Sequence, residues 1–474
     1  MNTVTVVGAG PAGLAAALAA ADLGCDVTLI DSAPAPGGQI YRQSLLHEQE
    51  SSKDSGPARL PPRLHRAVSH PRVRYLPAAS VWHAERIAGA DEFVLRLAGP
   101  DGGPCACAEA LPGPVRSRAV IVAAGSGELV LPFPGWDLPG VTTVGAAQAL
   151  LKSQDVTIGR RAIVAGSGPL LLPAAAGLAA AGVRVLAVLE ATRATAGLRG
   201  GAGLAGYPGK LAEAAGYAAT LARHRVPVRP GHAVVGCRGE GRVQRATVAR
   251  LDRDWRPVPG SQRDVEVDAL HVSFGFSPAL ELTRLLGCAD EPHPDRPVAA
   301  VRVDGDQATS VAGVFAAGEV TGVGGADLAE LEGYLAGAAA AAHLGLPAAA
   351  GRVPRLGAIR ASRDRARRFA ARLEAAYPLR PGWLSWLSPH TVVCRCEEVR
   401  WSEITRAVAA GARDVRAVKG LTRCGMGYCQ ARICGATVQH ALSNLSGRPL
   451  NEVGDLHSRS ILTPVSLNVI TNTP

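Results

Sequence analysis

The sequence of 474 residues is poor in aromatic side chains, at 4% of the chain, and it contains no run of about 20 apolar residues. The alanine-rich stretch LAGAAAAAHLGLPAAA (335–350) is interrupted by His343 and Pro347, so no membrane-spanning helix is predicted. A strand-like run, TVTVVGAG, begins at Thr3, where a signal peptide would lie. We therefore expect a cytoplasmic protein, with peripheral attachment at the inner face of the membrane as the alternative.

Nucleic-acid binding is the function that a net charge of +10 would suggest, but the distribution of the charge argues against it. Residues 351–390 hold nine arginines, no lysine and two acidic residues, so a net charge of +7 lies in one segment. Its centre, RASRDRARRFAARLE, lacks interleaved aromatic residues and any nucleic-acid-binding motif. The segment indicates the solvated face of a helix in a linker or, alternatively, a docking surface for an acidic partner or a phosphate.

Apolar residues at 47% and charged residues at 19% are typical of a globular protein, and the length suits about three domains. Five of the ten cysteines fall between residues 394 and 434. Such clustering favours metal ligation in a reducing compartment over a framework of disulfides.

The start of the sequence carries a dinucleotide-binding pattern. The run VTVVGAGPAGLAAALAAADLGCDVTLID (4–31) predicts a strand, a glycine turn, a helix and a second strand. Gly8 permits the tight turn, Gly10 lets the backbone approach a pyrophosphate, and Gly13 lets the helix pack on the sheet. Asp31 lies 23 residues after Gly8, near the spacing of a carboxylate that binds ribose hydroxyls.

A second run, RAIVAGSGPLLLPAAAGLAAAGVRVLAVLE (161–190), repeats this pattern with Gly166, Gly168 and, 24 residues after Gly166, Glu190. Leu171 stands at the position of the third glycine and would hold the helix farther from the strand, which loosens the geometry for a pyrophosphate. We expect a second Rossmann-like unit, either as an NAD(P)H site or as a retained scaffold. No redox CxxC lies in this half of the chain, so disulfide reductase chemistry is not expected.

The C-terminal cysteines have the spacing of a metal cluster. Cys394 and Cys396 form a CxC pair, and after 32 intervening residues a CxxxxC pair follows. Four thiolates can hold zinc or an iron–sulfur cluster, and structural zinc more often uses CxxC knuckles, so the spacing favours [2Fe–2S]. One cysteine is surplus, because Cys424–Cys429 and Cys429–Cys434 both have the CxxxxC spacing.

Three further segments resemble the cofactor-contacting motifs of flavoproteins with two dinucleotide-binding domains: APAPGGQIYRQ (33–43), AVIVAAGSGE (119–128) and GVFAAGEVTGVGGADLAELEG (313–333). The resemblance implies FAD at the first site, with Glu319 on a ribityl or phosphate hydroxyl; ATP, or FMN at a subunit interface, is an alternative. The residues implied to bind the cofactor are Gly8, Gly10, Pro11, Ala12, Gly13, Asp31, Gly37, Gly38, Gln39, Arg42, Ala124, Gly125, Gly318, Glu319 and Gly325.

The pattern CRCEEV…GLTRCGMGYCQARIC is similar to the bacterioferritin-associated-ferredoxin-like [2Fe–2S] domain fused to the alpha-type subunits of opine oxidase, hydroxyproline dehydrogenase, dye-linked proline dehydrogenase and hydrogen cyanide synthase. The segments GGQIYR, PFPGW, GSGPLLLP and SFGFSP resemble the same group. The leucine at the third position of the second glycine motif also matches the pattern of that group. The resemblance implies Cys394, Cys396, Cys429 and Cys434 as the cluster ligands and leaves Cys424 at a variable position.

The resemblance also implies a function. A separate beta-type flavoprotein subunit would take a hydride from an amine or amino acid, and this chain would pass the electrons to an acceptor such as a small ferredoxin-like subunit or the respiratory chain. A flavin accepts two electrons and [2Fe–2S] carries one at a time, so a chain with both can split the pair. The alternatives are a self-contained NAD(P)H:acceptor flavin reductase and a non-catalytic scaffold with a retained nucleotide and structural zinc.

The fold class expected is α/β, with two Rossmann-like domains, one split by insertion of the other, and a small α-rich cysteine-cluster domain. The boundaries predicted are 1–140 with 290–350 for the FAD domain, 141–289 for the second Rossmann-like domain, 351–389 for an arginine-rich linker, 390–445 for the cluster domain and 446–474 for an extended tail. His232 and His271 lie in strand-like apolar surroundings and are interpreted as structural. Arg395 is expected to place a positive charge beside the cluster and favour its reduced state.

Overall fold

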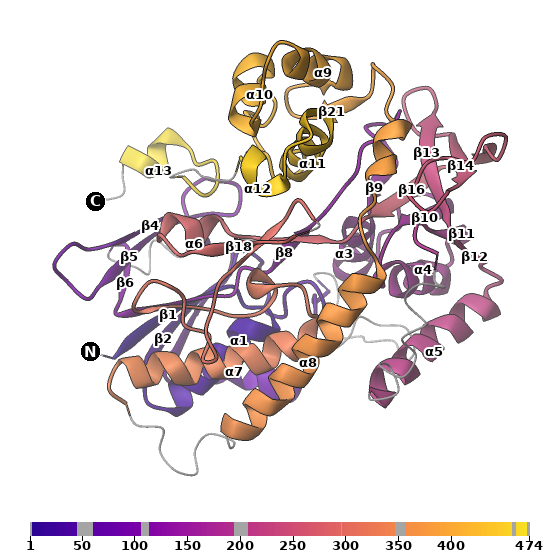
Figure 1. Cartoon of the computed structure of the whole chain (residues 1–474). Helices are drawn as coiled ribbons and strands as arrows, with labels where there is room; N and C mark the ends of the chain where they lie inside the picture. Colours follow the sequence, from indigo (N-terminus) through magenta and orange to yellow (C-terminus); the bar gives the residue numbers. More distant parts are fainter. Residues whose placement is uncertain are drawn as a thin grey trace.

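The computed structural model describes residues 2–44, 60–105, 113–193, 207–294, 296–346, 356–456 and 461–471. Two parallel sheets, each flanked by helices, and a helical lobe make up most of the molecule (Figure 1). None of the helices in these ranges is long and apolar enough to cross a membrane.

The first parallel sheet has the order β20-β7-β1-β2-β3. Its strands are β1 (Thr3–Val7), β2 (Asp26–Ile30), β3 (Val73–Leu76), β7 (Ala119–Val122) and β20 (Val314–Ala316). Helices α1 (Pro11–Asp22) and α7 (Ala326–His343) pack against each other beside this sheet. Glycine makes their contact close, because a Cβ on Gly333 would lie 2.1 Å from the Ala12 carbonyl oxygen. One Rossmann-like unit is thus built from two distant parts of the chain.

The second parallel sheet has the order β12-β11-β10-β16-β9. Its strands are β9 (Val141–Thr143), β10 (Arg161–Gly166), β11 (Arg184–Glu190), β12 (Val228–Pro230) and β16 (Ala269–Ser273). Apolar residues of α3 (Val144–Gln154), α4 (Leu171–Ala180) and α5 (Pro208–Arg223) pack on one face. An antiparallel sheet of β13 (His232–Arg238), β14 (Arg245–Arg250) and β15 (Arg263–Glu266) covers the other. The three central strands, β10, β11 and β16, are covered on both faces and are apolar over most of their length, whereas the edge strand β12 is exposed.

Shorter elements connect and flank the two units. Strand β8 pairs with β17 in an antiparallel ribbon between them, and β4, β5 and β6 form a three-stranded sheet. The bounds are α2 (Pro62–Ser69), β4 (Ser80–Arg86), β5 (Phe93–Ala98), β6 (Val115–Ser117), β8 (Ser126–Glu128), β17 (Phe276–Pro278), α6 (Glu281–Leu285), β18 (Asp290–Pro292), β19 (Ala299–Val301) and η3 (Glu319–Thr321).

The arginine-rich sequence forms α8 (Leu356–Ala376), which crosses α7 in Figure 1. Arg367 Nε lies 2.8 Å from Glu332 Oε1, and Arg363 is buried, with NH1 3.0 Å from Gln307 Oε1. The predicted linker boundaries stay a prediction, but two arginines of this helix bond inward to the first unit and do not belong to a solvated face. Residues 351–355, also assigned to the linker, lie outside the described residues.

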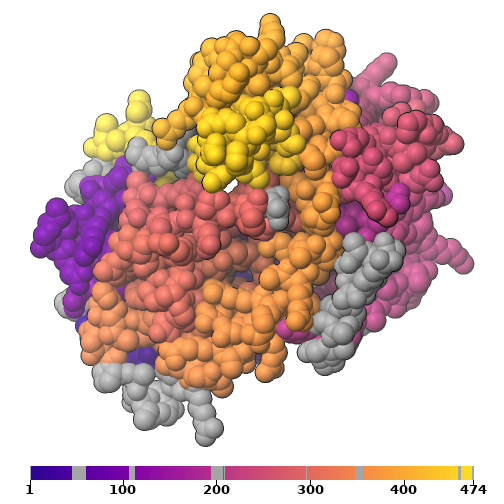
Figure 2. Space-filling view, in the orientation of Figure 1, coloured from indigo at the N-terminus to yellow at the C-terminus, as the bar shows by residue number. Residues whose placement is uncertain are grey.

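The cysteine-containing lobe stands on one side of the molecule in Figure 2. It contains β21 (Val392–Cys394), β22 (Val399–Arg400), α9 (Trp401–Ala409), α10 (Val415–Thr422) and α11 (Gly435–Ser446), with a core of its own. The segment before it, η4 (Pro381–Trp386), anchors it, because the fully buried Trp383 donates its indole N–H to His440 Nδ1 at 2.9 Å. The predicted α/β class with two Rossmann-like units and a small α-rich cysteine domain is confirmed.

The segment after residue 446 contains two short helices, α12 (Leu450–Val453) and α13 (Leu467–Thr471), so the prediction of an extended tail is wrong there. Val469 packs with Trp82 and Ala98, and Leu462 N–H donates to the Trp82 carbonyl at 2.9 Å. The tail therefore packs against the sheet of β4 and β5. Residues 457–460 and 472–474 lie outside the described residues.

Candidate cofactor sites

The first glycine loop connects β1 to α1, and its glycines are required by close contacts. Gly8 has a φ of +107°, and a Cβ there would lie 2.2 Å from the Ala123 carbonyl oxygen. A Cβ on Gly13 would lie 1.7 Å from the Gly8 carbonyl oxygen. Helix α1 begins at Pro11, with Gly10 before it in extended conformation. The loop therefore has the shape that the sequence predicts for a phosphate-binding turn.

Asp31 holds this loop in place. Its carboxylate accepts hydrogen bonds from the amide of Ala9 in the loop and, at 2.7 Å, from the amide of Ala33. Burial raises the pKa of Asp31 above its ordinary value, against the lowering by these two amides and by Arg42. The predicted contact of Asp31 with a ribose stays a prediction; what the structure adds is this contact with the loop.

The second predicted segment, 33–43, lies across the glycine loop. A Cβ on Gly38 would lie 2.9 Å from the Gly10 Cα, and Gly37 has a φ of +121°. Arg42 donates to Gln39 Oε1 at 2.9 Å, but its buried Nε has no partner among the described residues. Lys152 of α3 donates to the Ile40 carbonyl at 3.3 Å, and burial, then Arg42, lowers the pKa of Lys152. A buried unpaired donor with a second cation nearby fits an anionic cofactor.

Residues 318–325 close the site from the other side. A Cβ on Gly318 would lie 2.9 Å from the Ala12 Cβ, which places this turn at the first turn of α1. Glu319 accepts a hydrogen bond from the hydroxyl of Ser126, next to Gly125, and burial raises the pKa of Glu319. Segments around residues 10, 38, 126 and 319 thus meet at one place, as a single cofactor site requires.

Sequence reasoning missed three polar residues that support this site. Glu332, 1% exposed, accepts from the Gly318 amide at 2.9 Å and from the Thr321 hydroxyl at 2.8 Å. Arg367 of α8 pairs with it, and Lys152 comes from the second unit. A glutamate inside an alanine-rich helix, an arginine in a charge run and a lone lysine carry no local signal. Only tertiary contacts identify them.

The second glycine loop repeats the first with one difference. Glu190 accepts from the amides of Gly168 at 3.0 Å and Thr192 at 2.8 Å, as Asp31 does in the first unit, and burial raises the pKa of Glu190 to about 7. Helix α4 begins five residues after Gly166, whereas α1 begins three residues after Gly8. Leu171, 1% exposed, fills the core at that point. The helix N-terminus is therefore farther along the chain from the loop, while the predicted wider spacing between helix and strand stays a prediction.

The two histidines interpreted as structural have different surroundings. His271 is fully buried in β16, with Nδ1 2.8 Å from the Thr142 hydroxyl, and burial lowers the pKa of His271 to about 4. His232 instead lines a cavity between the two sheets of the second unit.

Five cysteines converge in the C-terminal lobe. The Sγ atoms of Cys394, Cys424 and Cys434 all lie within 4.8 Å of one another, and all three residues are buried. Cys396, which is exposed, is hydrogen-bonded to Cys429. A Cβ on Gly427 would lie 2.2 Å from the Cys396 Cβ, so the close passage of these two loops depends on glycine.

The thiols of Cys424 and Cys434 lower the pKa of Cys394 to about 2, and the shared charge raises the pKa of both donors. Such a set of soft sulfur ligands fits a thiophilic metal centre, whose cations would supply the missing positive charge. Of the predicted ligands, the structure brings Cys394 to Cys434 and Cys396 to Cys429. It adds Cys424 as a candidate. All five are free thiols, whereas Cys105 is disulfide-bonded.

The cluster lobe contacts the segment PFPGW through the arginine between two cysteines. The Arg395 guanidinium lies over the Trp136 ring, 5.0 Å from its centroid, and donates to the Asp137 carbonyl at 3.4 Å. Trp136 in turn donates its indole N–H to the Val392 carbonyl at 2.6 Å. On the other side of the lobe Arg432 Nε pairs with Glu281 at 2.8 Å. Arg395 therefore fixes the lobe on the body of the protein.

Comparison with known proteins gives two family matches. Residues 2–343 match the family described as pyridine nucleotide-disulphide oxidoreductase. Residues 392–444 match the BFD-like [2Fe-2S] binding domain.

Several curated relatives match over nearly the whole chain. An opine oxidase subunit of Rhizobium meliloti is 32% identical over 99% of this chain and 87% of its own length. The HcnB subunit of hydrogen cyanide synthase from Pseudomonas aeruginosa is 31% identical over 98% of each. The alpha subunit of sarcosine oxidase from Rhizobium meliloti is 27% identical over 98% of this chain and 42% of its own length.

Among solved structures, L-proline dehydrogenase from P. horikoshii has a TM-score of 0.65 at 18% identity, over 99% of this chain and 79% of that one. Thioredoxin reductase of T. acidophilum has a TM-score of 0.50 at 20% identity, over 73% of this chain and 98% of that one. These likenesses concern the fold.

Proposed function

The chain belongs to the pyridine nucleotide-disulphide oxidoreductase family, and from that premise we propose that it is the flavin and iron–sulfur subunit of a hetero-oligomeric amine or amino-acid dehydrogenase or oxidase. It is an FAD-dependent oxidoreductase with a [2Fe–2S] domain. The donor proposed is a CH–NH or CH–NH2 group of the opine, hydroxyproline or proline class. FAD accepts two electrons as a hydride, and a [2Fe–2S] centre passes them on one at a time.

One observation carries this proposal: the cysteine lobe lies directly on the flavin-type body in the same chain. The contact through Arg395 and Trp136 fixes the lobe beside residues that follow β8, and the Thr437 hydroxyl of α11 donates to the Val130 carbonyl at 3.1 Å. A two-electron site and a one-electron site held together in this way suit electron transfer within the chain. The full-length likeness to subunits named for opine oxidase and hydrogen cyanide synthase supports the same function.

We assign the cofactor contacts from the sequence motifs and this geometry. Gly8, Gly10 and Gly13 with the start of α1 would hold the FAD pyrophosphate, Asp31 its ribose, and Glu319 a ribityl or phosphate hydroxyl. Arg42, with its buried unpaired Nε, would neutralise phosphate charge. Cys394, Cys396, Cys429 and Cys434 are the proposed cluster ligands.

The partners proposed are a beta-type flavoprotein subunit, which would carry the amine-oxidising site, and an onward acceptor such as a small ferredoxin-like subunit or the respiratory chain. Apolar side chains around the cysteines are exposed: Leu421 at 62%, Met426 at 38% and Tyr428 at 71%. Exposed apolar patches of this kind mark interaction sites. We therefore propose that a one-electron acceptor docks over Tyr428 and the exposed Cys396.

The test uses the purified full chain under anaerobic conditions. We expect its flavin absorbance to stay oxidised when proline, hydroxyproline or an opine is added alone, and to bleach once the co-expressed beta-type subunit is present. The cluster should then give a [2Fe–2S] signal by electron paramagnetic resonance. Bleaching by an amino acid without any partner, or no bleaching with the partner present, would contradict the proposed division of labour.

A self-contained NAD(P)H reductase is the second candidate, and one observation favours it. Gly168 has a φ of +125°, and apart from its chain neighbours no atom of the described residues lies within 4 Å of the position of its Cβ, which leaves room for a ligand at the second glycine loop. Rapid bleaching of the flavin by NADH or NADPH in the isolated chain would establish this activity. We expect no such bleaching, because the later start of α4 moves its amide donors away from the loop.

A further inference from the structure

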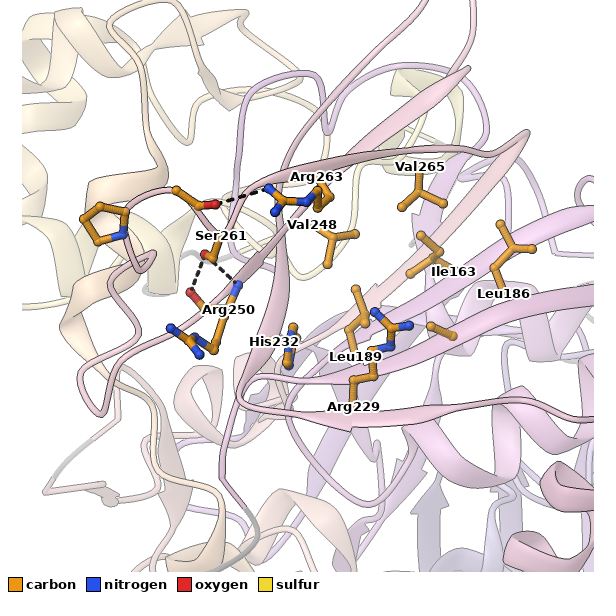
Figure 3. Close-up of a pocket in the computed structure, with 13 residues that line it drawn as sticks. Ile163, Leu186, Leu189, Arg229, His232, Val248, Arg250, Ser261, Arg263 and Val265 are labelled. Atoms are coloured by element: carbon orange, nitrogen blue, oxygen red, sulfur yellow. Dashed lines mark hydrogen bonds between the residues drawn. The ribbon is translucent and has the colours of Figure 1, made fainter.

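The two sheets of the second unit border a cavity of about 490 Å³ that is partly open to solvent, and Figure 3 shows its lining residues. It lies between β10 and β11 on one side and β14 and β15 on the other, and no residue of the glycine loop 166–171 lines it. Its lining residues are Ile163, Leu186, Ala187, Leu189, Arg229, His232, Val248, Arg250, Pro259, Gly260, Ser261, Arg263 and Val265.

The floor of this cavity is apolar, and a β-bulge widens it. The pairing of β10 with β11 shifts register so that Leu186 has no partner, while Val185 and Ala187 pair with Ala162 and Ile163. Neighbouring strand residues normally face opposite sides of a sheet. Because of the bulge, Leu186 and Ala187 both line the cavity. Val265, Ile163 and Leu186 lie together on one side of the cavity in Figure 3.

The mouth of the cavity is cationic. Arg250 and Arg263 lie on the strand faces that carry Val248 and Val265, and Arg229 comes from β12. The inner faces of packed sheets normally carry apolar residues. Arginines on these faces are therefore unusual, and they point to a role in binding.

No carboxylate lines the cavity, and the acids nearest in sequence are already engaged. Asp264 bonds Arg238 and the Thr247 hydroxyl, and Glu266 bonds Arg161. Among the described residues, the guanidinium groups of Arg229 and Arg250 have no hydrogen-bond partner or ion pair, and Arg263 donates only to backbone carbonyls of Gly260 and Gln262. Three positive charges therefore lie at the opening, and no described residue of the lining supplies a counter-charge.

The mouth is also held in a fixed shape. The Ser261 hydroxyl accepts from the Arg250 amide at 3.1 Å and donates to the Val258 carbonyl at 2.6 Å, which fastens the β14–β15 connection over the opening. Figure 3 shows the bond of Ser261 to the backbone of Arg250 and the bond of Arg263 to the backbone of Gly260. A preformed mouth lowers the cost of ordering side chains around a ligand.

We propose that this cavity binds a small amphipathic anion, with its apolar body against Ile163, Leu186 and Leu189 and its carboxylate or phosphate head among Arg229, Arg250 and Arg263. The volume lies within the range of about 300–1,000 Å³ usual for small-molecule sites. The site is separate from both cofactor sites and independent of the electron-transfer function proposed above.

Titration calorimetry of the full holo chain with decanoate tests the proposal. We expect one saturable site per chain, and at least tenfold weaker binding, about 1.4 kcal/mol, in Arg250→Gln and in Arg263→Gln. Decyl phosphate in a second arm identifies which head group binds more tightly. Leu186→Trp, which fills the floor, should abolish binding, and Arg368→Gln on the exposed face of α8 is the matched control with unchanged affinity.

Decyltrimethylammonium carries the same chain with the opposite charge and should not bind. The proposal is overturned by the absence of saturable binding of both decanoate and decyl phosphate to the wild type. It is also overturned by equal affinity in the wild type, Arg250→Gln and Arg263→Gln, or by decyltrimethylammonium binding as tightly as decanoate.

Discussion

At the residue scale, the lobe has five cysteines for the four ligand positions of a [2Fe–2S] cluster. Whether Cys424 binds the cluster determines which four cysteines are the ligands. Its Sγ lies within 4.8 Å of those of Cys394 and Cys434. If the ligands are the four proposed, Cys424→Ala keeps the full iron and acid-labile sulfide content per chain, whereas Cys429→Ala loses at least half of it. Metal and sulfide analysis with the absorption spectrum measures this.

Cys237→Ala is the matched control, because it also removes a buried free thiol but from β13, outside the lobe. Loss of the cluster in Cys424→Ala, together with its retention in Cys396→Ala or Cys429→Ala, would make Cys424 a ligand. The glycine-and-cysteine pattern alone cannot separate these sets, because the spacing from Cys424 to Cys429 equals that from Cys429 to Cys434.

Glu190 makes stability depend on pH. Burial raises its pKa from 4.5 to about 7, so between these values the unfolded chain releases the proton while the folded chain still holds it. Rising pH therefore lowers the free energy of unfolding between pH 4.5 and 7, by roughly 3 kcal/mol at 1.36 kcal/mol per unit, and the loss is complete above pH 7.

The glutamine of Glu190→Gln cannot ionise, so the variant does not lose stability in this way. As the pH rises from 4.5 to 8, we expect its free energy of unfolding to increase by this amount relative to that of the wild type. Urea unfolding at several pH values gives the difference. Glu240→Gln, at an exposed carboxyl group, should run parallel to the wild type. Parallel curves for Glu190→Gln and the wild type would refute the prediction.

At the scale of elements, α8 shows how a charge run becomes part of a core. Arg367→Gln leaves the buried Glu332 carboxylate with two hydrogen-bond donors and no cation. We expect a loss of roughly 2 kcal/mol, less than the 3–5 of a fully buried pair, because Arg367 is 34% exposed. FAD retention should also fall, because Glu332 holds the Gly318 amide next to Glu319. Thermal unfolding and flavin content measure the two effects.

The neighbouring Arg368→Gln removes the same charge from the exposed side of α8 and should change neither quantity. An equal effect of both substitutions would mean that the charge of the helix matters and its pairing with Glu332 does not.

The elements that could be predicted from the sequence are those with local signals. The glycines of both loops stand at set spacings between an apolar run and an alanine-rich run, so the strand–turn–helix units follow from local sequence. The contacts of Gly8 with Ala123 and of Gly166 with Ser273 appear only in the folded chain. The inward turn of Arg363 and Arg367 could not be predicted, because their partners Gln307 and Glu332 are distant in sequence. The bulge at Leu186 likewise exists only in the pairing of β10 with β11.

At the scale of the whole molecule, the relation between the lobe and the body governs electron transfer. The tail contributes to it, since Arg432 donates to the Leu462 carbonyl and pairs with Glu281 of α6. The effect of the Arg395 charge on the cluster stays a prediction. Its guanidinium lies over Trp136, so Arg395 also contributes to where the lobe sits. Position and potential can therefore be tested separately.

Trp136→Ala removes both the ring under Arg395 and the donor to the Val392 carbonyl, so the lobe is held less closely on this side of the body while its other contacts remain. Because electron transfer falls steeply with the distance between cofactors, we expect the cluster to be reduced several-fold more slowly after one-electron reduction of the chain, with unchanged cluster content. Samples frozen at intervals and followed by the electron paramagnetic resonance signal of the cluster give the rate. Trp82→Ala, a buried tryptophan of β4 outside this contact, controls for the lost packing. An unchanged rate in Trp136→Ala would mean that this contact does not set the transfer distance.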